Sequence, residues 1–336
     1  MATLRPMPRC RVDPTIERVT VEGFQFPLGV YPVEPMTPKP GYTMEFEPAD
    51  GDNDGDLEEW PDRYVFDIVI SWDRLEPMCR SLLALFPGRI YPILDVLGHD
   101  AYREIDPYIS HDLYGMDRFT DCLRRYRGFF FEDGLCGFGV MIDEPFLYMF
   151  VDEHKIVTVR TQPEYKERVE KVLHAFDLEQ MENPAGADSA SHEHRGVLSV
   201  EDARPDILNQ DEIVEQLRDE WRLVLNVDPD ANTDEEGRDL GVCPWRCLAR
   251  LAVEDDEKCR YADILLTAPN LRRAEEMVVE ATDALLPKDV ADWDEATIIN
   301  ADRLRPEDFV QVLTERSQKP PQKPQEERII WCEWLE

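Results

Sequence analysis

The sequence predicts an α+β fold of two domains, each with a mainly antiparallel sheet covered by helices on one face. Its length of 336 residues suits about two domains. Between residues 127 and 160, short apolar runs are separated by turn residues, which is typical of an antiparallel meander. Residues 165–176 then place apolar side chains on one helical face, which can cover such a sheet. An extended Pro-rich N-terminal arm and a short C-terminal strand or peptide complete the prediction.

Residues 1–60 are predicted to form the extended arm, which includes an acidic run. Prolines between Pro27 and Pro40 interrupt its β-like segments and restrict them to edge strands. The first domain is predicted at residues 61–180, where strand and helix patterns alternate before the meander. Its predicted elements are a strand at 64–71, a helix from Asp73 to the Pro87-Gly88 stop, a strand at 89–97, a short helix at 116–126, and meander strands at 127–134, 135–142, 146–151 and 155–160.

Three glycines, Gly134, Gly137 and Gly139, lie before and within the second predicted strand of the meander. A phosphate-binding loop would need a helix N-terminus directly after the glycines, and the pattern predicts none there. Glycine inside a strand indicates instead a bulge or the close approach of a neighbouring group. We therefore expect a bulge or close packing against aromatic side chains at these positions.

Residues 181–205 contain almost no apolar side chains and are predicted to be a linker. His192-Glu193-His194 lies within this segment, where a flexible chain would not hold a catalytic geometry. The second α+β domain is predicted at residues 206–316, and residues 317–327 are predicted to be a Pro/Gln linker. The predicted elements of the second domain are a helix at 211–220, strands at 221–227, 245–253 and 258–267, a helix after Asn270, a strand at 297–299 and a helix at 306–316.

Residues 328–336 form a short aromatic segment after the second linker, and exposed aromatic residues lower solubility. We therefore expect this segment to pack against a protein surface. One version is an intramolecular edge strand that completes the second domain. The other is a docking peptide for another protein, with Ile330, Trp331 and Trp334 as candidate partner-binding residues.

The net charge of −35 arises from 72 acidic and 37 basic residues. A field of this sign repels phosphate backbones and anionic membranes, so we expect neither direct nucleic-acid binding nor membrane binding. The charge suits a protein partner with a basic face. The cysteines lie largely within apolar segments, which is typical of reduced thiols and predicts a cytoplasmic location.

An acidic run in the arm resembles half of a calcium-binding loop, with carboxylates at alternate positions and glycine at the sixth. Pro61 occupies the twelfth position, where a bidentate Glu would close such a site. We therefore expect this run to bind calcium weakly or not at all. The alternative to a calcium site is a solvated acidic linker. We predict no other cofactor. The candidate metal ligands are Asp50, Asp52, Asp54, Asp56 and Glu58.

A second group of polar residues follows the strand predicted at 89–97. Histidine and carboxylate side chains are the usual ligands of hydrolytic metal centres, although their spacing here matches no defined site. Turns also collect Asp residues because these form local hydrogen bonds. The group contains Asp95 and Glu104. It also contains the candidate catalytic residues His99, Asp100, Asp106, His111 and Asp112.

The chain contains no nucleophile elbow, Walker sequence or H-E-x-x-H motif. The sequence therefore favours a non-enzymatic, acidic cytoplasmic protein that acts through protein–protein binding. Two alternatives remain: a metal-dependent hydrolase that uses the cluster at 95–112, and an acidic decoy of nucleic acid that occupies the basic surface of a partner.

Overall fold

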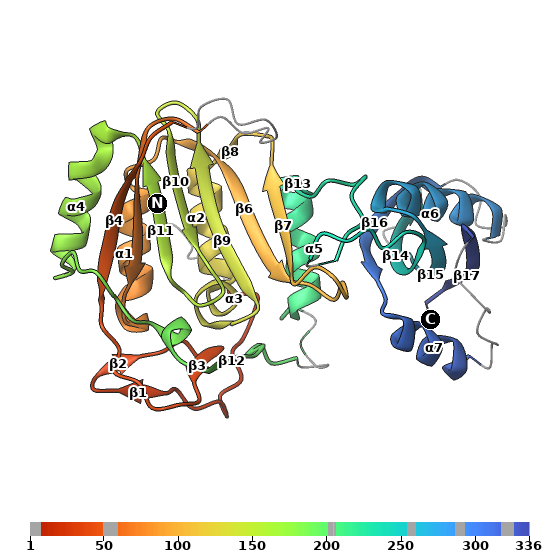
Figure 1. The fold of residues 1–336 in the computed structure, drawn as a ribbon, viewed down its shortest axis with the longest axis horizontal. Helices are drawn as coiled ribbons and strands as arrows, with labels where there is room; N and C mark the ends of the chain where they lie inside the picture. Colours follow the sequence, from red (N-terminus) through yellow and green to blue (C-terminus); the bar gives the residue numbers. More distant parts are fainter. Residues whose placement is uncertain are drawn as a thin grey trace. The chain divides into compact units, whose positions relative to one another are not determined.

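The computed structural model divides the chain into two units (Figure 1). The first comprises Met1–Val96 and Pro107–Asn226, and the second comprises Leu97–Asp106 and Val227–Glu336. Each unit contains an antiparallel sheet with helices packed on it, so the predicted α+β class is confirmed. The structure describes residues 8–49, 60–200, 204, 206–234, 236–253, 260–285, 293–316 and 326–335.

The first unit is organised around a large sheet with the strand order β13-β7-β6-β9-β10-β11-β5-β4, in which β8 also pairs with β6. The strands β9, β10 and β11 form the predicted antiparallel meander, and β11 pairs with β5. The Pro-rich arm contributes β4 to the edge of this sheet. The strands are β4 (Gly41–Glu47), β5 (Arg63–Val69), β6 (Arg89–Leu97), β7 (Ile105–Ser110), β8 (Tyr114–Gly115), β9 (Cys136–Ile142), β10 (Leu147–Val151), β11 (Val157–Thr161) and β13 (Leu223–Leu225).

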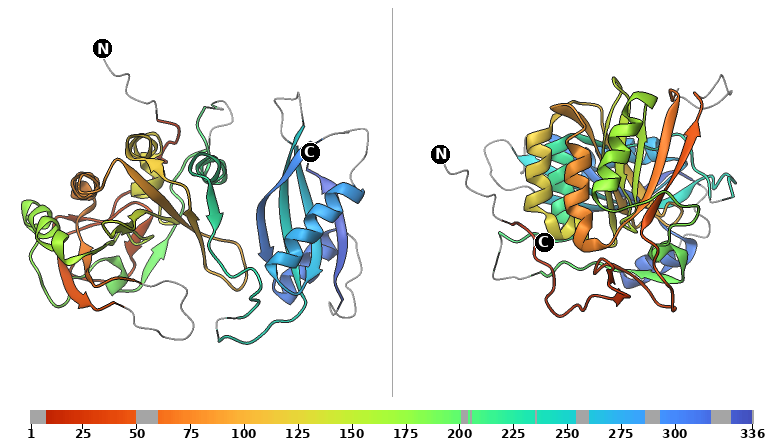
Figure 2. Two further views of the ribbon diagram at one scale, coloured as in Figure 1. Left: turned by 90° about the horizontal axis from the view of Figure 1, so that it is seen from above. Right: turned by 90° about the vertical axis from the view of Figure 1, so that its left-hand side faces the viewer.

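The α-helices described in the first unit lie together on one side of the large sheet (Figure 2). Alternate strand residues such as Phe138, Met149 and Val159 are buried in the core with the apolar stripes of these helices. Trp221 stacks on Phe130 within that core, with ring centroids 5.9 Å apart. The helices are α1 (Trp72–Leu83), α2 (Met116–Arg125), α3 (Arg127–Glu132), α4 (Lys166–Ala175) and α5 (Gln210–Trp221), with a 3₁₀ turn, η1 (Pro163–Tyr165), before α4.

The opposite side of the large sheet, called here the open face, carries no α-helix among the described elements (Figure 2). Side chains on neighbouring positions of a strand point to opposite faces. In β10, Leu147, Met149 and Val151 are buried, whereas Tyr148 and Phe150 are only half-buried and point to the open face. The same alternation in β11 places Arg160 on the open face beside them.

The segment predicted as a linker at 181–205 is instead hydrogen-bonded to the N-terminal arm over its described part. Its strand β12 (His192–His194) pairs with β3 (Val30–Pro32), and the backbone of Lys39 pairs with that of Ala185. Backbone hydrogen bonds hold this segment even though it has few apolar side chains, which is why composition alone predicted a flexible chain. The arm also forms β1 (Thr20–Val21) and β2 (Phe24–Gln25), and η2 (Ala187–Ser189) precedes β12.

Residues 127–132 form the short helix α3, so the prediction of a first meander strand there is wrong. Phe129, Phe130 and Phe131 are all buried, and the backbone N–H of Phe130 donates to the carbonyl of Tyr126. An unbroken apolar run has no period of two or 3.6 residues, so the pattern does not distinguish a buried strand from a buried helix.

The helix predicted at 211–220 is present as α5, and Asn209 and Glu212 form a capping box at its start. However, α5 packs in the core of the first unit, and β13 pairs with β7. The division between the units therefore follows Asn226 rather than residue 205. Local sequence patterns define a helix but do not show which sheet it covers, so the predicted boundary differs.

The second unit contains a sheet with the order β16-β14-β15-β17, in which every pair is antiparallel. The helix α6 packs on this sheet, and α7 packs against Leu265 and Trp331. The C-terminal segment forms the edge strand β17, which is the intramolecular version of the two predicted arrangements. The elements are β14 (Cys243–Val253), β15 (Arg260–Ala268), α6 (Leu271–Leu285), β16 (Trp293–Arg303), α7 (Pro306–Glu315) and β17 (Arg328–Trp334).

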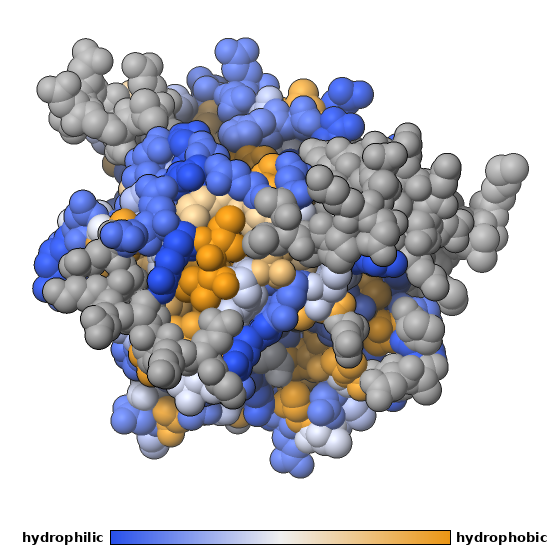
Figure 3. Space-filling model, turned by 90° about the vertical axis from the view of Figure 1, so that its right-hand side faces the viewer, coloured by the Kyte–Doolittle hydropathy of each residue, from blue (hydrophilic) through white to orange (hydrophobic). Residues whose placement is uncertain are grey.

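Apolar side chains also reach the surface of the second unit. Figure 3 shows apolar residues gathered in a patch that is bordered by hydrophilic residues. Val279, Val310 and Leu335 are the described large apolar side chains of this unit that are more than two-fifths exposed. A patch of this kind can mark an interaction site, but these side chains do not indicate the chemistry of a partner.

Candidate functional site

A cavity of about 500 Å³ lies on the open face of the large sheet, within the first unit. Its walls are largely apolar and aromatic, with a small number of charged groups, which is the usual composition of a ligand site. A volume of this size also falls in the usual range for such sites. The lining residues used below are Trp60, Ile93, Asp95, Met141, Asp143, Tyr148, Phe150 and Arg160.

The strand pairing of the sheet brings these residues together. Tyr148 pairs with Met141 on one side and with Arg160 on the other. One row further along, Phe150 pairs with Gly139, which pairs in turn with Ile93. Residues from β6, β9, β10 and β11 therefore form one continuous surface, although they are distant in the sequence.

Two glycines of β9 allow the ring of Phe150 to lie against the sheet. A Cβ atom built on Gly137 or Gly139 would lie 2.7 Å from an atom of the Phe150 ring. A Cβ on Gly139 would also lie 2.5 Å from the backbone oxygen of Met149. The predicted close packing of these glycines against an aromatic side chain is therefore confirmed. Because the glycines have no Cβ atoms, the ring lies closer to the strand and the cavity is deeper.

Arg160 provides the positive charge of the cavity. Its Nε atom is buried and has no hydrogen-bond partner among the described residues. The guanidinium carbon lies 5.5 Å from the ring centroid of Trp60 and 5.4 Å from that of Tyr148, within the range of cation–π contacts. These contacts hold the guanidinium in place, but they leave the Nε–H group without an acceptor, so this donor is available to a ligand.

Asp95 provides an acidic group on the same surface. Burial, together with the negative charge of Glu153, raises the pKa of Asp95 to about 7. Burial also raises the pKa of Tyr148 to about 12. At neutral pH, a large share of Asp95 is therefore protonated and can donate a hydrogen bond, and Tyr148 keeps its hydroxyl proton.

The other residues of the predicted catalytic cluster do not converge on one site. In the second unit, Asp100 is buried and lies 2.7 Å from Arg303, and Asp106 lies 2.6 Å from Arg103. In the first unit, Asp112 lies 3.0 Å from Arg222 at the surface. The remaining two candidates, His99 and His111, are exposed. Each of these carboxylates is thus paired with an arginine, which is the arrangement of a structural ion pair.

The remaining predicted site residues fall in two places. The candidate calcium ligands Asp50, Asp52, Asp54, Asp56 and Glu58 lie outside the described residues. In β17, the ring of Trp331 is buried and its Nε1–H donates to Asp263 at 3.3 Å, whereas Ile330 and Trp334 are half-buried. Trp331 therefore contributes to the fold of the second unit.

Sequence reasoning missed the cavity because its residues occupy the half-buried positions of otherwise ordinary strands. The feature of the sequence that could have indicated the cavity is the aromatic pair Tyr148 and Phe150, which lies opposite two glycines in the neighbouring strand. A cluster of His154, His192 and His194 was also missed, since His154 and His192 are 38 positions apart in the chain. The spacing of His192 and His194 could have indicated this cluster, because it places both side chains on one face of a strand.

No family model, curated protein or solved structure matches this chain. None of the described helices is both long enough and apolar enough to cross a membrane. The cysteines in the described residues are all free, and Cys79 and Cys136 are buried. The cavity and its chemistry are therefore the features that indicate a function.

Proposed function

We propose that this protein is a non-enzymatic binding protein that holds another protein through the cavity on the open face of its first unit. An apolar or aromatic side chain of the partner would fill the cavity. A backbone or side-chain oxygen next to this anchor would accept the hydrogen bond that Arg160 offers. Buried aromatic or aliphatic anchors in such pockets commonly dominate the affinity of protein interfaces.

The observation that carries this proposal is the buried Nε of Arg160, which has no partner among the described residues. A buried donor without an acceptor costs about 1–3 kcal/mol, and more when the group is charged. Binding of an acceptor removes this cost, so the free energy of that hydrogen bond appears in the affinity. The aromatic walls supply the remaining contact area. Trp60 and Tyr148 already flank the guanidinium, so their side chains lose little conformational entropy when the partner binds.

The charge of the protein favours a partner with a basic face. The net charge of −35 attracts such a partner over long distances and accelerates association. At the cavity itself, Asp143 is exposed and can face a cationic side chain that flanks the apolar anchor. The expected binding motif is therefore an apolar or aromatic residue with basic neighbours.

A library of displayed random peptides, selected on the full-length chain, tests this proposal. We expect enriched peptides to carry an aromatic or long aliphatic residue beside Lys or Arg. Arg160→Gln removes the charge of the donor and should weaken binding of these peptides roughly 10- to 100-fold, as expected for about 1.5–3 kcal/mol. The matched control is Arg168→Gln, an exposed position in α4, which should leave the affinity unchanged.

Phe150→Ala serves as a second variant because it enlarges the cavity without removing its charge. Retained binding of the selected peptides by both Arg160→Gln and Phe150→Ala contradicts the proposal, as does the failure to enrich any peptide. An acidic decoy of nucleic acid, the alternative that depends on net charge alone, would bind basic partners equally well in all of these variants. The same measurement therefore separates the two functions.

A further inference from the structure

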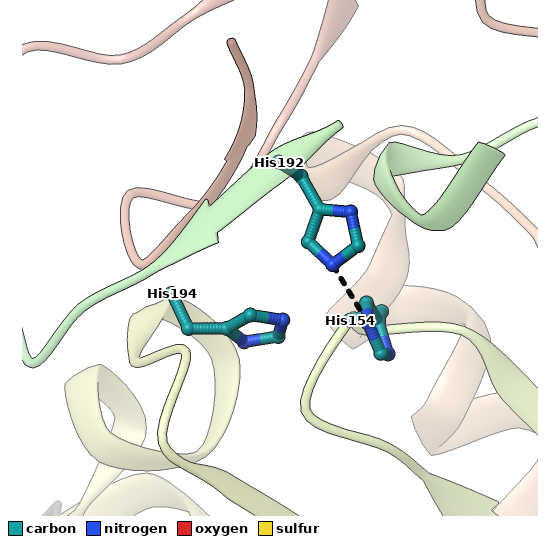
Figure 4. A group of neighbouring side chains, drawn as sticks. All are labelled: His154, His192 and His194. Carbon is teal, nitrogen blue, oxygen red and sulfur yellow. Dashed lines mark hydrogen bonds between the residues drawn. The ribbon is translucent and has the colours of Figure 1, made fainter. Parts of the chain in front are cut away.

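Three histidines of the first unit converge at the edge of the N-terminal arm (Figure 4). His192 and His194 extend from β12 toward His154, which lies in the turn between β10 and β11. One ring nitrogen from each residue lies within 4.8 Å of those of the other two. The three rings are partly exposed, so an ion can reach them from solvent.

The strand β12 determines the direction of two of these rings. Because side chains alternate along a strand, His192 and His194 share one face, and Glu193 points away to accept a hydrogen bond from the Tyr31 hydroxyl at 2.7 Å. The Nδ1 atom of His192 lies 2.8 Å from the carbonyl oxygen of Ala190. A carbonyl can only accept, so this Nδ1 carries the proton and the lone pair of neutral His192 is on Nε2.

The Nδ1 atoms of the other two rings also face oxygen atoms. The Nδ1 of His194 lies 2.8 Å from the carbonyl oxygen of Gly134. The Nδ1 of His154 lies 3.3 Å from a carboxylate oxygen of Glu153 and 3.5 Å from one of Asp152. The Nδ1 atoms of His192 and His194 thus have carbonyl acceptors, and that of His154 faces two carboxylates, so in all three rings Nε2 is the favoured position for the lone pair. Acceptors of this kind orient the histidine ligands of metal sites.

The Nε2 atoms of His154 and His192 are only 3.1 Å apart. If both Nδ1 atoms carry the protons, two lone pairs face each other at this distance, and a cation is needed between them. A tetrahedral zinc ion with Zn–N bonds of about 2.0–2.1 Å separates its ligand nitrogens by about 3.3 Å. The observed spacing of this pair is therefore close to that of a zinc site.

From this geometry we propose that His154, His192 and His194 bind a single divalent transition-metal ion of the zinc class through their Nε2 atoms. Imidazole is a preferred ligand for such ions, whereas Ca²⁺ and Mg²⁺ prefer oxygen. Three protein ligands leave a fourth position for water or another ligand. The carboxylates of Asp152 and Glu153 add negative charge next to the site, which favours a cation.

The metal would join segments that are far apart in the sequence. His154 belongs to the β10–β11 hairpin of the large sheet, and the other two ligands belong to a strand that pairs with β3 of the arm. A bound ion therefore crosslinks the arm and residues 192–194 to the sheet. Because only the folded chain holds the three ligands together, binding should stabilise this unit.

The competing explanation is a proton shared between His154 and His192. If His154 is protonated, its Nε2–H can donate to His192 and no metal is required. Titration of the purified, tag-free protein with Zn²⁺ in excess Mg²⁺ distinguishes the two. We expect one Zn²⁺ per chain, a higher melting temperature on zinc addition, and visible absorption bands of a nitrogen-ligated, four-coordinate ion when Co²⁺ replaces Zn²⁺.

His154→Ala and His192→Ala should each abolish both stoichiometric zinc binding and the stabilisation by zinc. The matched control is His174→Ala, an exposed histidine of α4, which should bind zinc like the unaltered chain. Long-range ¹⁵N NMR on the unaltered chain is a second test, and it does not depend on whether the substituted proteins fold. Zinc should shift the Nε2 signals of His154, His192 and His194 and leave those of the other three of the six histidines in place. Absence of zinc binding, or binding that leaves these three signals unchanged, overturns the proposal.

Discussion

Arg303 in the second unit has a buried side chain and Arg160 in the first has a buried Nε atom, but the surroundings of the two differ. Arg303 donates to both carboxylate oxygens of Asp100, to Asn232 and to the carbonyl of Thr233. The Nε of Arg160 has no acceptor among the described residues and lies between aromatic rings. Removing one partner of a satisfied buried ion pair destabilises the fold, whereas an unsatisfied donor in a cavity favours an external ligand.

The largest effect is expected from breaking the satisfied network. Arg303→Met leaves the buried carboxylate of Asp100 without its counter-charge and should destabilise the second unit by about 3–5 kcal/mol. Urea unfolding measures this loss. The matched control Arg272→Met removes an exposed ion pair with Asp230 in the same unit and should hardly move the transition. Similar midpoints for the two variants would show that the Arg303 network is not structural.

The floor of the cavity is expected to be the next most sensitive place. Gly139→Ala puts a Cβ against the backbone oxygen of Met149 and the ring of Phe150, and should cost about 1–3 kcal/mol. Gly88→Ala is the control, because a Cβ there meets nothing within 4 Å. If the two variants unfold at the same urea concentration, the aromatic ring does not lie where we describe it.

Asp95 should make the stability of the first unit depend on pH. Its pKa rises from an ordinary value of 3.8 to about 7 in the folded chain, so the folded chain binds more protons than the unfolded chain between these values. The unfolding free energy contributed by Asp95 therefore falls as pH rises from about 4 to 7.

Asp95→Asn removes this dependence and should stabilise the chain by on the order of 1 kcal/mol at pH 8, with a smaller difference at pH 4. Unfolding of both proteins in urea at the two pH values gives the comparison. A variant that is less stable at pH 8 than the original chain would mean that the carboxylate is favourably solvated or paired.

The smallest effect on stability is expected at Arg160. Arg160→Met removes the cost of the unsatisfied donor but also removes the cation–π contacts with Trp60 and Tyr148. Because these two effects oppose each other, the free energy of unfolding should change by less than about 0.5 kcal/mol or increase slightly. Together with Arg303→Met, this variant sharpens the contrast between the two arginines. A loss of several kcal/mol, measured in urea, would place Arg160 among the structural residues.

Much of the fold follows from local sequence patterns. The alternation in β10 and the apolar stripe of α1 predict their buried faces, because each depends only on the period of the element. The helix α3 was predicted as a strand, since three consecutive phenylalanines give no period. The placement of α5 and β13 depends on non-local pairing with β7, which local patterns do not contain.

The candidate sites were less predictable than the fold. The cavity requires four strands to be neighbours in space, and its key residue Arg160 follows ordinary alternation in β11. The histidine cluster depends on the pairing of β12 with β3, in a segment whose composition indicated a linker. The predicted cluster at 95–112 contributed only Asp95 to the cavity, because the other candidate carboxylates are paired with arginines.

Observation of the Nε–H group of Arg160 shows whether the open face binds a partner through this residue. The side-chain Nε–H signal of Arg160 can be assigned in ¹H–¹⁵N NMR spectra as the one that disappears in Arg160→Met. On titration with a peptide selected on the chain, we predict that this signal shifts downfield and exchanges more slowly with water, as expected for a new hydrogen bond. If saturating peptide leaves the Arg160 signal unchanged, Arg160 does not bind the partner.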